Sequence, residues 1–95
     1  MTTKGRTQLL KITYSKRFHK HYQKLQTEEK KRVKHKIKLL FENPLHPSLR
    51  SKRIKGTVDL FECSVNMDLR IIWYYEGRDI VMLLDVGHHD LLNHY

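Results

Sequence analysis

The hydrophobic positions of this 95-residue chain change period twice, and each change marks a change in secondary structure. Residues 1–7 are polar, and we expect them to be flexible, whereas residues 8–14 read as a short strand. Residues 16–26 are predicted to form a helix, because apolar side chains recur there at i, i+4 and i+7. The apolar positions of this first helix are Phe18, Tyr22 and Leu25, and Ser15 offers an N-cap.

A second helix is predicted over residues 27–42. Thr27 is a suitable N-cap, and the acidic residues that follow it occupy the first turn, where the helix dipole favours negative charge. The expected buried face consists of Val33, Ile37, Leu40 and Phe41. Asn43-Pro44 should end the helix, so the two helices form a hairpin whose outer surface is rich in lysine.

The second half of the chain is typical of an antiparallel sheet. Residues 43–56 are irregular and basic, and we expect a loop over the rim of the sheet. Three strand-like runs follow, at residues 60–66, 69–75 and 80–86, with connections short enough for hairpins. The pattern predicts one α+β domain over residues 1–95, in which a helical hairpin covers one face of the sheet and leaves the other partly open. The residues after the last strand are expected to form one helical turn.

Composition narrows the possible functions. The net charge is +9, and it is unevenly distributed: residues 1–55 carry +14, whereas residues 56–95 carry −5. A cationic face of this kind favours a polyanionic partner, first of all nucleic acid, although a merely solvated lysine-rich surface is the alternative. The single cysteine cannot form an internal disulfide. Since no apolar run approaches the length that spans a bilayer, we expect a soluble, cytoplasmic protein with no membrane partner.

Arg70 is the first candidate for a functional side chain, because it interrupts an otherwise apolar strand. Strand alternation places it on the same face as Ile72 and Tyr74, among groups that are normally covered. One interpretation is an internal ion pair with Asp68 or Glu62. The other is a guanidinium that binds a phosphate through its two parallel N–H groups.

Further candidates lie in the basic loop and at the C-terminus. His89 follows the last strand and titrates near neutrality, so it can transfer a proton during phosphodiester cleavage, although a surface histidine without a role is the commoner case. Tyr95 can stack on a base, or it can simply be the end of the chain. The loop carries Arg50, Lys52, Arg53 and Lys55, which can either stabilise the negative charge of a phosphorane transition state or remain solvated. We expect no metal and no small-molecule cofactor, since no histidine pair has helical ligand spacing and no phosphate-binding loop motif is present.

Together these segments resemble the RelE/ParE superfamily of toxins from toxin–antitoxin pairs. The resemblance covers nearly the whole chain, and it rests on the order and spacing of several segments. These are the basic helical hairpin, Asn43 to Leu49, Lys52-Arg53-Ile54-Lys55-Gly56, Leu60 to Val65, Leu69 to Tyr74, and Val86-Gly87-His88-His89-Asp90.

The RelE-like branch of this superfamily implies a metal-independent endoribonuclease that cuts mRNA on the ribosome by attack of the 2′-hydroxyl group, and a neutralising antitoxin as partner. By position, Arg70 matches the strand arginine that stabilises the transition state, and His89 matches the C-terminal general acid or phosphate clamp. Lys55 matches a lysine that precedes the meander, Tyr95 falls near a C-terminal aromatic residue, and Lys52 stands where some relatives carry a Glu or His base.

The resemblance therefore implies catalytic roles for Arg70, His89, Lys52 and Lys55, with RNA bound by Arg50, Arg53 and Tyr95. The identity of the general base stays open, because other relatives carry catalytic lysines where this chain has Phe61 and Cys63. Two alternatives share the fold: a ParE-like inhibitor of DNA gyrase that is not an enzyme, and an inactive nucleic-acid-binding domain.

Overall fold

The structure, a computed structural model, describes residues 11–95 apart from the side chains of His89 and Leu92. The elements follow the order β1 (Lys11–Tyr14), α1 (Lys16–Gln23), α2 (Thr27–Glu42), the 3-10 helix η2 (Pro47–Leu49), β2 (Lys52–Arg53), β3 (Phe61–Ser64), β4 (Leu69–Glu76), β5 (Ile80–His88) and the 3-10 helix η3 (His89–His94). This order confirms the predicted α+β class. The predictions for residues 1–10 lie outside the described part of the chain.

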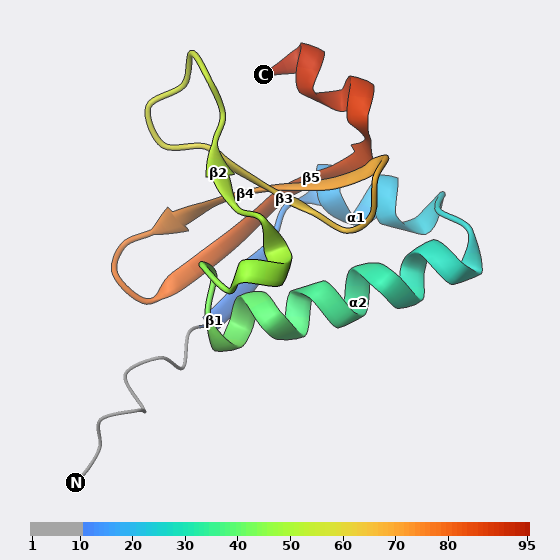
Figure 1. Ribbon diagram of the computed structural model, residues 1–95, viewed down its shortest axis with the longest axis horizontal. Helices are drawn as coiled ribbons and strands as arrows, with labels where there is room; N and C mark the ends of the chain where they lie inside the picture. Colours follow the sequence, from blue (N-terminus) through green and yellow to red (C-terminus); the bar gives the residue numbers. More distant parts are fainter. Residues whose placement is uncertain (1–10) are drawn as a thin grey trace, which may run out of the picture.

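The strands form one mixed sheet in the order β1-β5-β4-β3-β2. β1 is parallel to β5, and the other neighbours are antiparallel. The helices between β1 and the other strands supply the long crossover that a parallel pair requires. Helix α2 runs along one face of the sheet, whereas η3 and the segment joining β2 to β3 stand over the opposite face (Figure 1). We call these the helical face and the site face.

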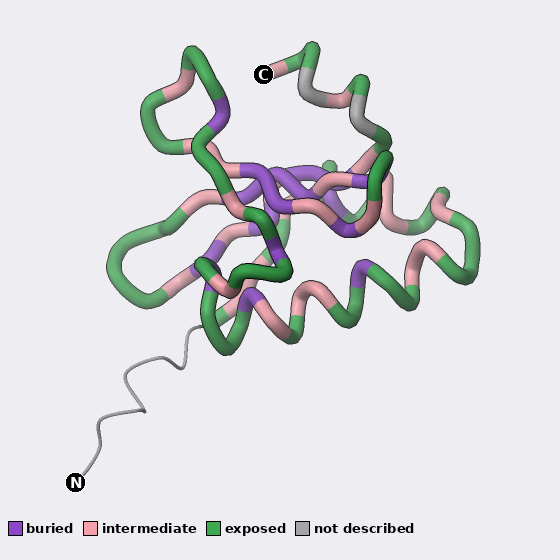
Figure 2. Tube along the Cα trace, in the orientation of Figure 1, coloured by how far each residue is buried: buried purple, intermediate pink, exposed green. Residues whose placement is uncertain are grey.

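The hydrophobic core lies between the helices and the helical face. Buried positions concentrate in the central strands, and α2 contributes only its inward turns (Figure 2). The fully buried side chains that pack together here include Val33 and Leu40 of α2, Ile71 and Trp73 of β4, and Val81 and Leu83 of β5. Phe41 was expected in this face but is 39% exposed. It lies about 100° around the helix from its neighbour Leu40, and that rotation turns it away from the sheet.

Both helix starts show how local hydrogen bonds set the ends of these elements. Ser15 caps α1 as predicted, because its Oγ accepts a hydrogen bond from the backbone N–H of Phe18 at 3.0 Å. Helix α2 is capped by Gln26 and not by Thr27. The backbone N–H of Gln26 donates to Oε1 of Glu29 at 2.9 Å, which completes a capping box and makes Thr27 the first helical residue.

The expected loop over residues 43–56 is wrong in one respect, since Lys52–Arg53 forms the edge strand β2. Lys52 pairs with Glu62 and Arg53 with Phe61. A strand of two charged residues has no apolar alternation, so hydrophobic periodicity could not predict it.

Strand β5 contains a bulge that changes which side chains face the core. Leu83 and Asp85 pair with consecutive residues of β4, so Leu84 is the extra residue. Strict alternation would place Asp85 on the helical face beside Leu83. The bulge turns Asp85 to the site face and brings Val86 into the core. No helix within residues 11–95 is long and apolar enough to cross a membrane.

Candidate active site

Arg70 lies on the site face, near the end of the sheet where β4 begins. Its Nε is 3.5 Å from Oε1 of Glu62, and its Nη1 donates to the carbonyl oxygens of Asn66 at 2.7 Å and Leu69 at 3.2 Å. Glu62 is buried, so solvent screens this ion pair only weakly. Of the two acidic partners considered for an internal ion pair, the structure shows Glu62 as the partner of Arg70.

The ion pair with Glu62 still leaves Arg70 able to bind a ligand. Its side chain is 19% exposed and lines a hollow of about 350 Å³ beside the free edge of β3. A guanidinium has five N–H groups, and the three contacts above occupy only part of them. Glu62 and the turn carbonyls therefore fix the orientation of the guanidinium, while the remaining N–H groups can bind a phosphate in the hollow.

The strand register brings Arg70 close to the start of η3. Arg70 pairs with Gly87 on one side and with Ser64 on the other. Two residues after Gly87 the chain reaches His89, the first residue of η3, whose side chain lies outside the described part. The backbone of His89 and the side chain of Arg70 thus belong to the same end of the sheet.

Lys52 is the residue of the basic loop that the register ties most directly to Arg70. It pairs across the sheet with Glu62, the carboxylate that holds Arg70. Paired residues of neighbouring antiparallel strands share a face, so Lys52 belongs to the site face. Its side chain is exposed, so a ligand that arrives from solvent can contact it.

Arg53 and Lys55 have different positions. The Arg53 side chain donates from Nη1 to the carbonyl oxygen of Val58 at 2.7 Å and lies 5.5 Å from the ring centroid of Phe61, so it holds the segment between β2 and β3. Lys55 is exposed on the turn of residues 54–57. Arg53 therefore has a structural contact, whereas Lys55 belongs to the segment joining β2 to β3, which stands over the site face (Figure 1).

Tyr95 is anchored by its hydroxyl group. This group donates to Oδ2 of Asp85 at 2.7 Å and accepts from Nη1 of Arg17 at 3.0 Å. Asp85 is only 1% exposed, and its Oδ1 is 2.6 Å from Nδ1 of His21. Burial, followed by the hydrogen bond to Asp85, raises the pKa of Tyr95, so the phenol stays protonated. Stacking of the Tyr95 ring on a base stays a prediction, because the described contacts of Tyr95 are made by its hydroxyl group.

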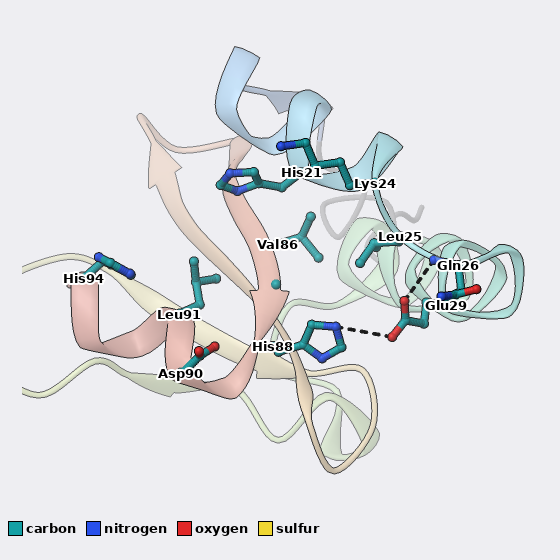
Figure 3. Close-up of a pocket in the computed structure, with 11 residues that line it drawn as sticks. His21, Lys24, Leu25, Gln26, Glu29, Val86, His88, Asp90, Leu91 and His94 are labelled. Atoms are coloured by element: carbon teal, nitrogen blue, oxygen red, sulfur yellow. Dashed lines mark hydrogen bonds and ion pairs between the residues drawn. The ribbon is translucent and has the colours of Figure 1, made fainter.

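A cleft of about 460 Å³ lies between the α1–α2 connection, the end of β5 and η3. Three histidines from three different elements face it, together with two carboxylates (Figure 3). The polar residues that line the cleft are His21, Lys24, Gln26, Glu29, His88, Asp90 and His94. A cleft with several imidazoles can exchange protons near neutral pH.

His88 contacts two carboxylates from different segments. Its Nδ1 is hydrogen-bonded to Asp68, and its Nε2 is 3.5 Å from Oε2 of Glu29, which points toward it across the cleft (Figure 3). The hydrogen bond to Asp68, aided by the charges of Glu29 and Asp90, raises the pKa of His88. The sequence alone predicts no functional role for His88. Since its carboxylate partners come from distant segments, no local pattern could have identified this role.

Cys63 and Phe61, which stand where some relatives carry lysines, do not face Arg70. Cys63 pairs with Ile71, and the Phe61 ring stacks on Trp73 at 4.7 Å, both on the helical face. Burial raises the pKa of the Cys63 thiol to about 12, so it is not a nucleophile. Among the described side chains, no group of three or more His, Cys, Asp and Glu residues is placed to hold a metal ion.

Comparison with known proteins identifies the family. Residues 10–94 match the family described as "Bacterial toxin of type II toxin-antitoxin system, YafQ". The chain belongs to the YafQ toxin family. This membership confirms the resemblance to the RelE/ParE superfamily of type II toxins. Among curated proteins, none matches the sequence.

Solved structures share the fold of this YafQ-family toxin. YafQ in the E. coli DinJ-YafQ toxin-antitoxin complex has a TM-score of 0.73 at 20% identity, over 88% of this chain and 97% of that one. The archaeal RelE-RelB complex from Pyrococcus horikoshii OT3 gives a TM-score of 0.71 at 19% identity, over 84% of this chain and 94% of that one. The YoeB dimer from Staphylococcus aureus gives a TM-score of 0.71 at 16% identity, over 85% of this chain and 98% of that one. At these identities the likeness establishes the fold alone.

Proposed function

We propose that this YafQ-family toxin is a metal-independent endoribonuclease that cleaves mRNA on the ribosome. The observation that carries the proposal is Arg70, a guanidinium fixed by a buried carboxylate and open to a hollow, at the sheet end where the backbone reaches His89. A group of this kind suits the stabilisation of charge on a phosphorane, because it is oriented before the substrate arrives.

The proposed reaction is transfer of the phosphoryl group to the neighbouring 2′-oxygen. The bond between the 2′-oxygen and phosphorus forms while the bond to the 5′-oxygen breaks, giving a 2′,3′-cyclic phosphate and a 5′-hydroxyl end. His89 donates a proton to the leaving 5′-oxygen, and Arg70 with Lys55 holds the phosphate. Lys52 is the proposed acceptor of the proton from the 2′-hydroxyl when its amine is neutral, or an electrostatic helper when it is protonated. Arg50, Arg53 and Tyr95 bind flanking RNA.

The proposed partners follow from family and charge. YafQ from E. coli and RelE from P. horikoshii were solved in complexes with DinJ and RelB. An antitoxin is therefore the proposed protein partner, and an acidic or amphipathic segment would complement the basic helical hairpin. The same cationic surface suits ribosomal RNA, which would place the toxin in the cytoplasm.

The test is to add antitoxin-free protein to a translating extract and map new mRNA 5′ ends. Arg70→Ala and His89→Ala are each expected to lower the cleavage rate by about 100-fold or more, because each removes a group used in the transition state. The matched controls are Arg78→Ala and His19→Ala, since both residues are exposed and lie outside the site. These controls should cleave at the wild-type rate.

Either of two results would contradict the proposal. Unchanged cleavage by His89→Ala would remove His89 as the acid. If the folded wild-type protein produces no cuts and yet arrests growth, the toxin acts by binding, and DNA gyrase becomes the first target to assay.

A further inference from the structure

The free edge of β3 carries a basic groove that contains Arg70 at one end and extends beyond the groups that take part in the proposed reaction. Two adjacent hollows, of about 350 and 270 Å³, share Lys36 and Val65 among their lining residues. We call them together the edge groove. Its basic residues are Lys31, Arg32, His35, Lys36, Arg50 and Arg70.

The groove exists because β2 is so short. β2 covers β3 only at Phe61 and Glu62, so beyond Glu62 the outer edge of β3 has no strand partner. Ser64 pairs with β4 on its inner side only. Helix α2 approaches this edge from the helical face, and Nζ of Lys36 donates to the carbonyl oxygen of Ser48 in η2 at 3.2 Å. Helix, 3-10 turn and strand edge thus form the walls of one groove.

Arg50 is held in the groove by an unusual backbone conformation. It is the only non-glycine residue in the described part of the chain with a positive φ, 51°. Its N–H donates to the carbonyl oxygen of Pro47 at 3.1 Å, and the preceding Leu49 is fully buried. A left-handed arginine is disfavoured in an unconstrained loop, so packing around Leu49 imposes this conformation.

The charge of the groove is mostly uncompensated. Five Lys and Arg side chains line it, whereas two carboxylates contact them: Glu62 at Arg70, and exposed Glu28 at 3.8 Å from Lys31. No carboxylate belongs to the described lining of either hollow. Met67, which is 94% exposed, stands at the rim of the larger hollow and offers an apolar contact.

We propose that the edge groove binds the phosphates of single-stranded RNA that follow one another away from the phosphate held by Arg70, with Arg50 and Lys36 as phosphate ligands. The choice of RNA as the ligand rests on the proposed function. Two small hollows that share one lysine suit a backbone with a repeating anionic group, and Arg50 and Arg70 offer forked donors for phosphate oxygens. An amphipathic peptide would instead need exposed apolar side chains within the groove. Val65, the only apolar residue that lines both hollows, is 6% exposed and offers little apolar surface.

The experiment measures binding of a fluorescent single-stranded 2′-O-methyl RNA octamer, which cannot be cleaved by 2′-hydroxyl attack, at a series of salt concentrations. Arg50→Gly is the main variant because glycine accepts the left-handed conformation, and Lys36→Ala is the second. Each should weaken binding and reduce the slope of log K against log salt by about 0.7, the contribution of one phosphate contact to a single strand. Arg78→Ala and Lys38→Ala remove the same charges from exposed positions outside the groove and should leave the slope unchanged.

Equal slopes for the groove variants and their controls would overturn the proposal. A second result would also overturn it. If Arg50→Gly no longer binds a poly-glutamate competitor but still binds the octamer, the groove is a protein-binding site. Because the octamer is not cleaved, failure here leaves the nuclease test intact. Conversely, His89→Ala should lose cleavage and retain the wild-type salt slope.

Discussion

At the scale of single residues, the acidic side chains of the C-terminal half act mainly as partners for particular cations. Glu62 holds Arg70, Asp85 contacts His21, and Asp68 binds His88. Glu62 with Arg70 and Asp68 with His88 each lie across one hairpin of neighbouring strands, whereas His21 and Asp85 are 64 residues apart. An ion pair of Arg70 with Asp68 or Glu62 is therefore within reach of a prediction from sequence, whereas the His21–Asp85 pair depends on the packing of α1 against β5.

His88 makes the stability of the protein depend on pH. Its pKa is raised in the folded protein, first by the hydrogen bond to Asp68 and then by the charges of Asp68, Glu29 and Asp90, although burial opposes them; Lys24 is the basic residue that lines the same cleft. Folding therefore favours the protonated imidazole. The stabilisation is complete below the ordinary histidine pKa of about 6.5, as long as the carboxylates are ionised, and it is lost as pH rises through the raised value.

The corresponding prediction concerns His88→Gln. This variant should lose more unfolding free energy relative to wild type at about pH 6 than at about pH 8.5, because only the lower pH populates the imidazolium. Urea unfolding of both proteins at the two pH values measures the difference. His19→Gln is the control, since His19 is exposed on α1 and lies outside the cleft. If His88→Gln lowers the unfolding free energy by the same amount at both pH values, the charge on His88 does not contribute to stability.

At the scale of elements, α2 has its predicted limits and α1 ends at Gln23, before the predicted residue 26, whereas the features set by strand pairing were not predicted. The limits of α2 agree with the prediction. Its apolar spacing identifies the helix, and Asn43-Pro44 ends it. The predicted last strand ends at Val86, whereas β5 continues to His88. Its bulge at Leu84 is a property of the β4–β5 register, which no single strand sequence specifies. The position of Asp85 on the site face, where it accepts a hydrogen bond from Tyr95, therefore could not be predicted from the sequence.

The anchoring of η3 leads to a prediction for Tyr95→Phe. This change keeps the ring but removes the hydroxyl that joins Asp85 to Arg17. Unfolding free energy should fall by about 1 kcal/mol or somewhat more, and amide hydrogen exchange in η3 should accelerate. Because the phenyl ring still stacks on bases, RNA binding should be retained if stacking is the main role. Wild-type exchange rates in η3 would contradict the anchoring role.

At the scale of the whole molecule, charge is separated between the periphery and the centre of the sheet. The N-terminal half, which carries +14, contributes both helices, η2 and the two edge strands β1 and β2. The C-terminal half, which carries −5, forms the three central strands, where Glu62 and Asp85 are buried. Sequence asymmetry thus becomes spatial asymmetry, because the chain places its neutral and acidic strands inside a basic perimeter.

The electrostatic field of a protein with a net charge of +9 should steer the toxin toward a polyanion, independently of any one contact. Lys16 and Lys20 are exposed on α1 and lie outside the edge groove, so replacing both by Gln tests this effect alone. At low ionic strength the association rate with ribosomes should fall about two- to threefold, and the difference should vanish near 1 M salt, where the Debye length is about 3 Å. Neutralising exposed Asp59 and Glu76 should have the opposite effect, which stopped-flow binding can measure. If the lysine variant instead changes the dissociation rate at all salt concentrations, these lysines make direct contacts and the long-range account of the basic perimeter is wrong.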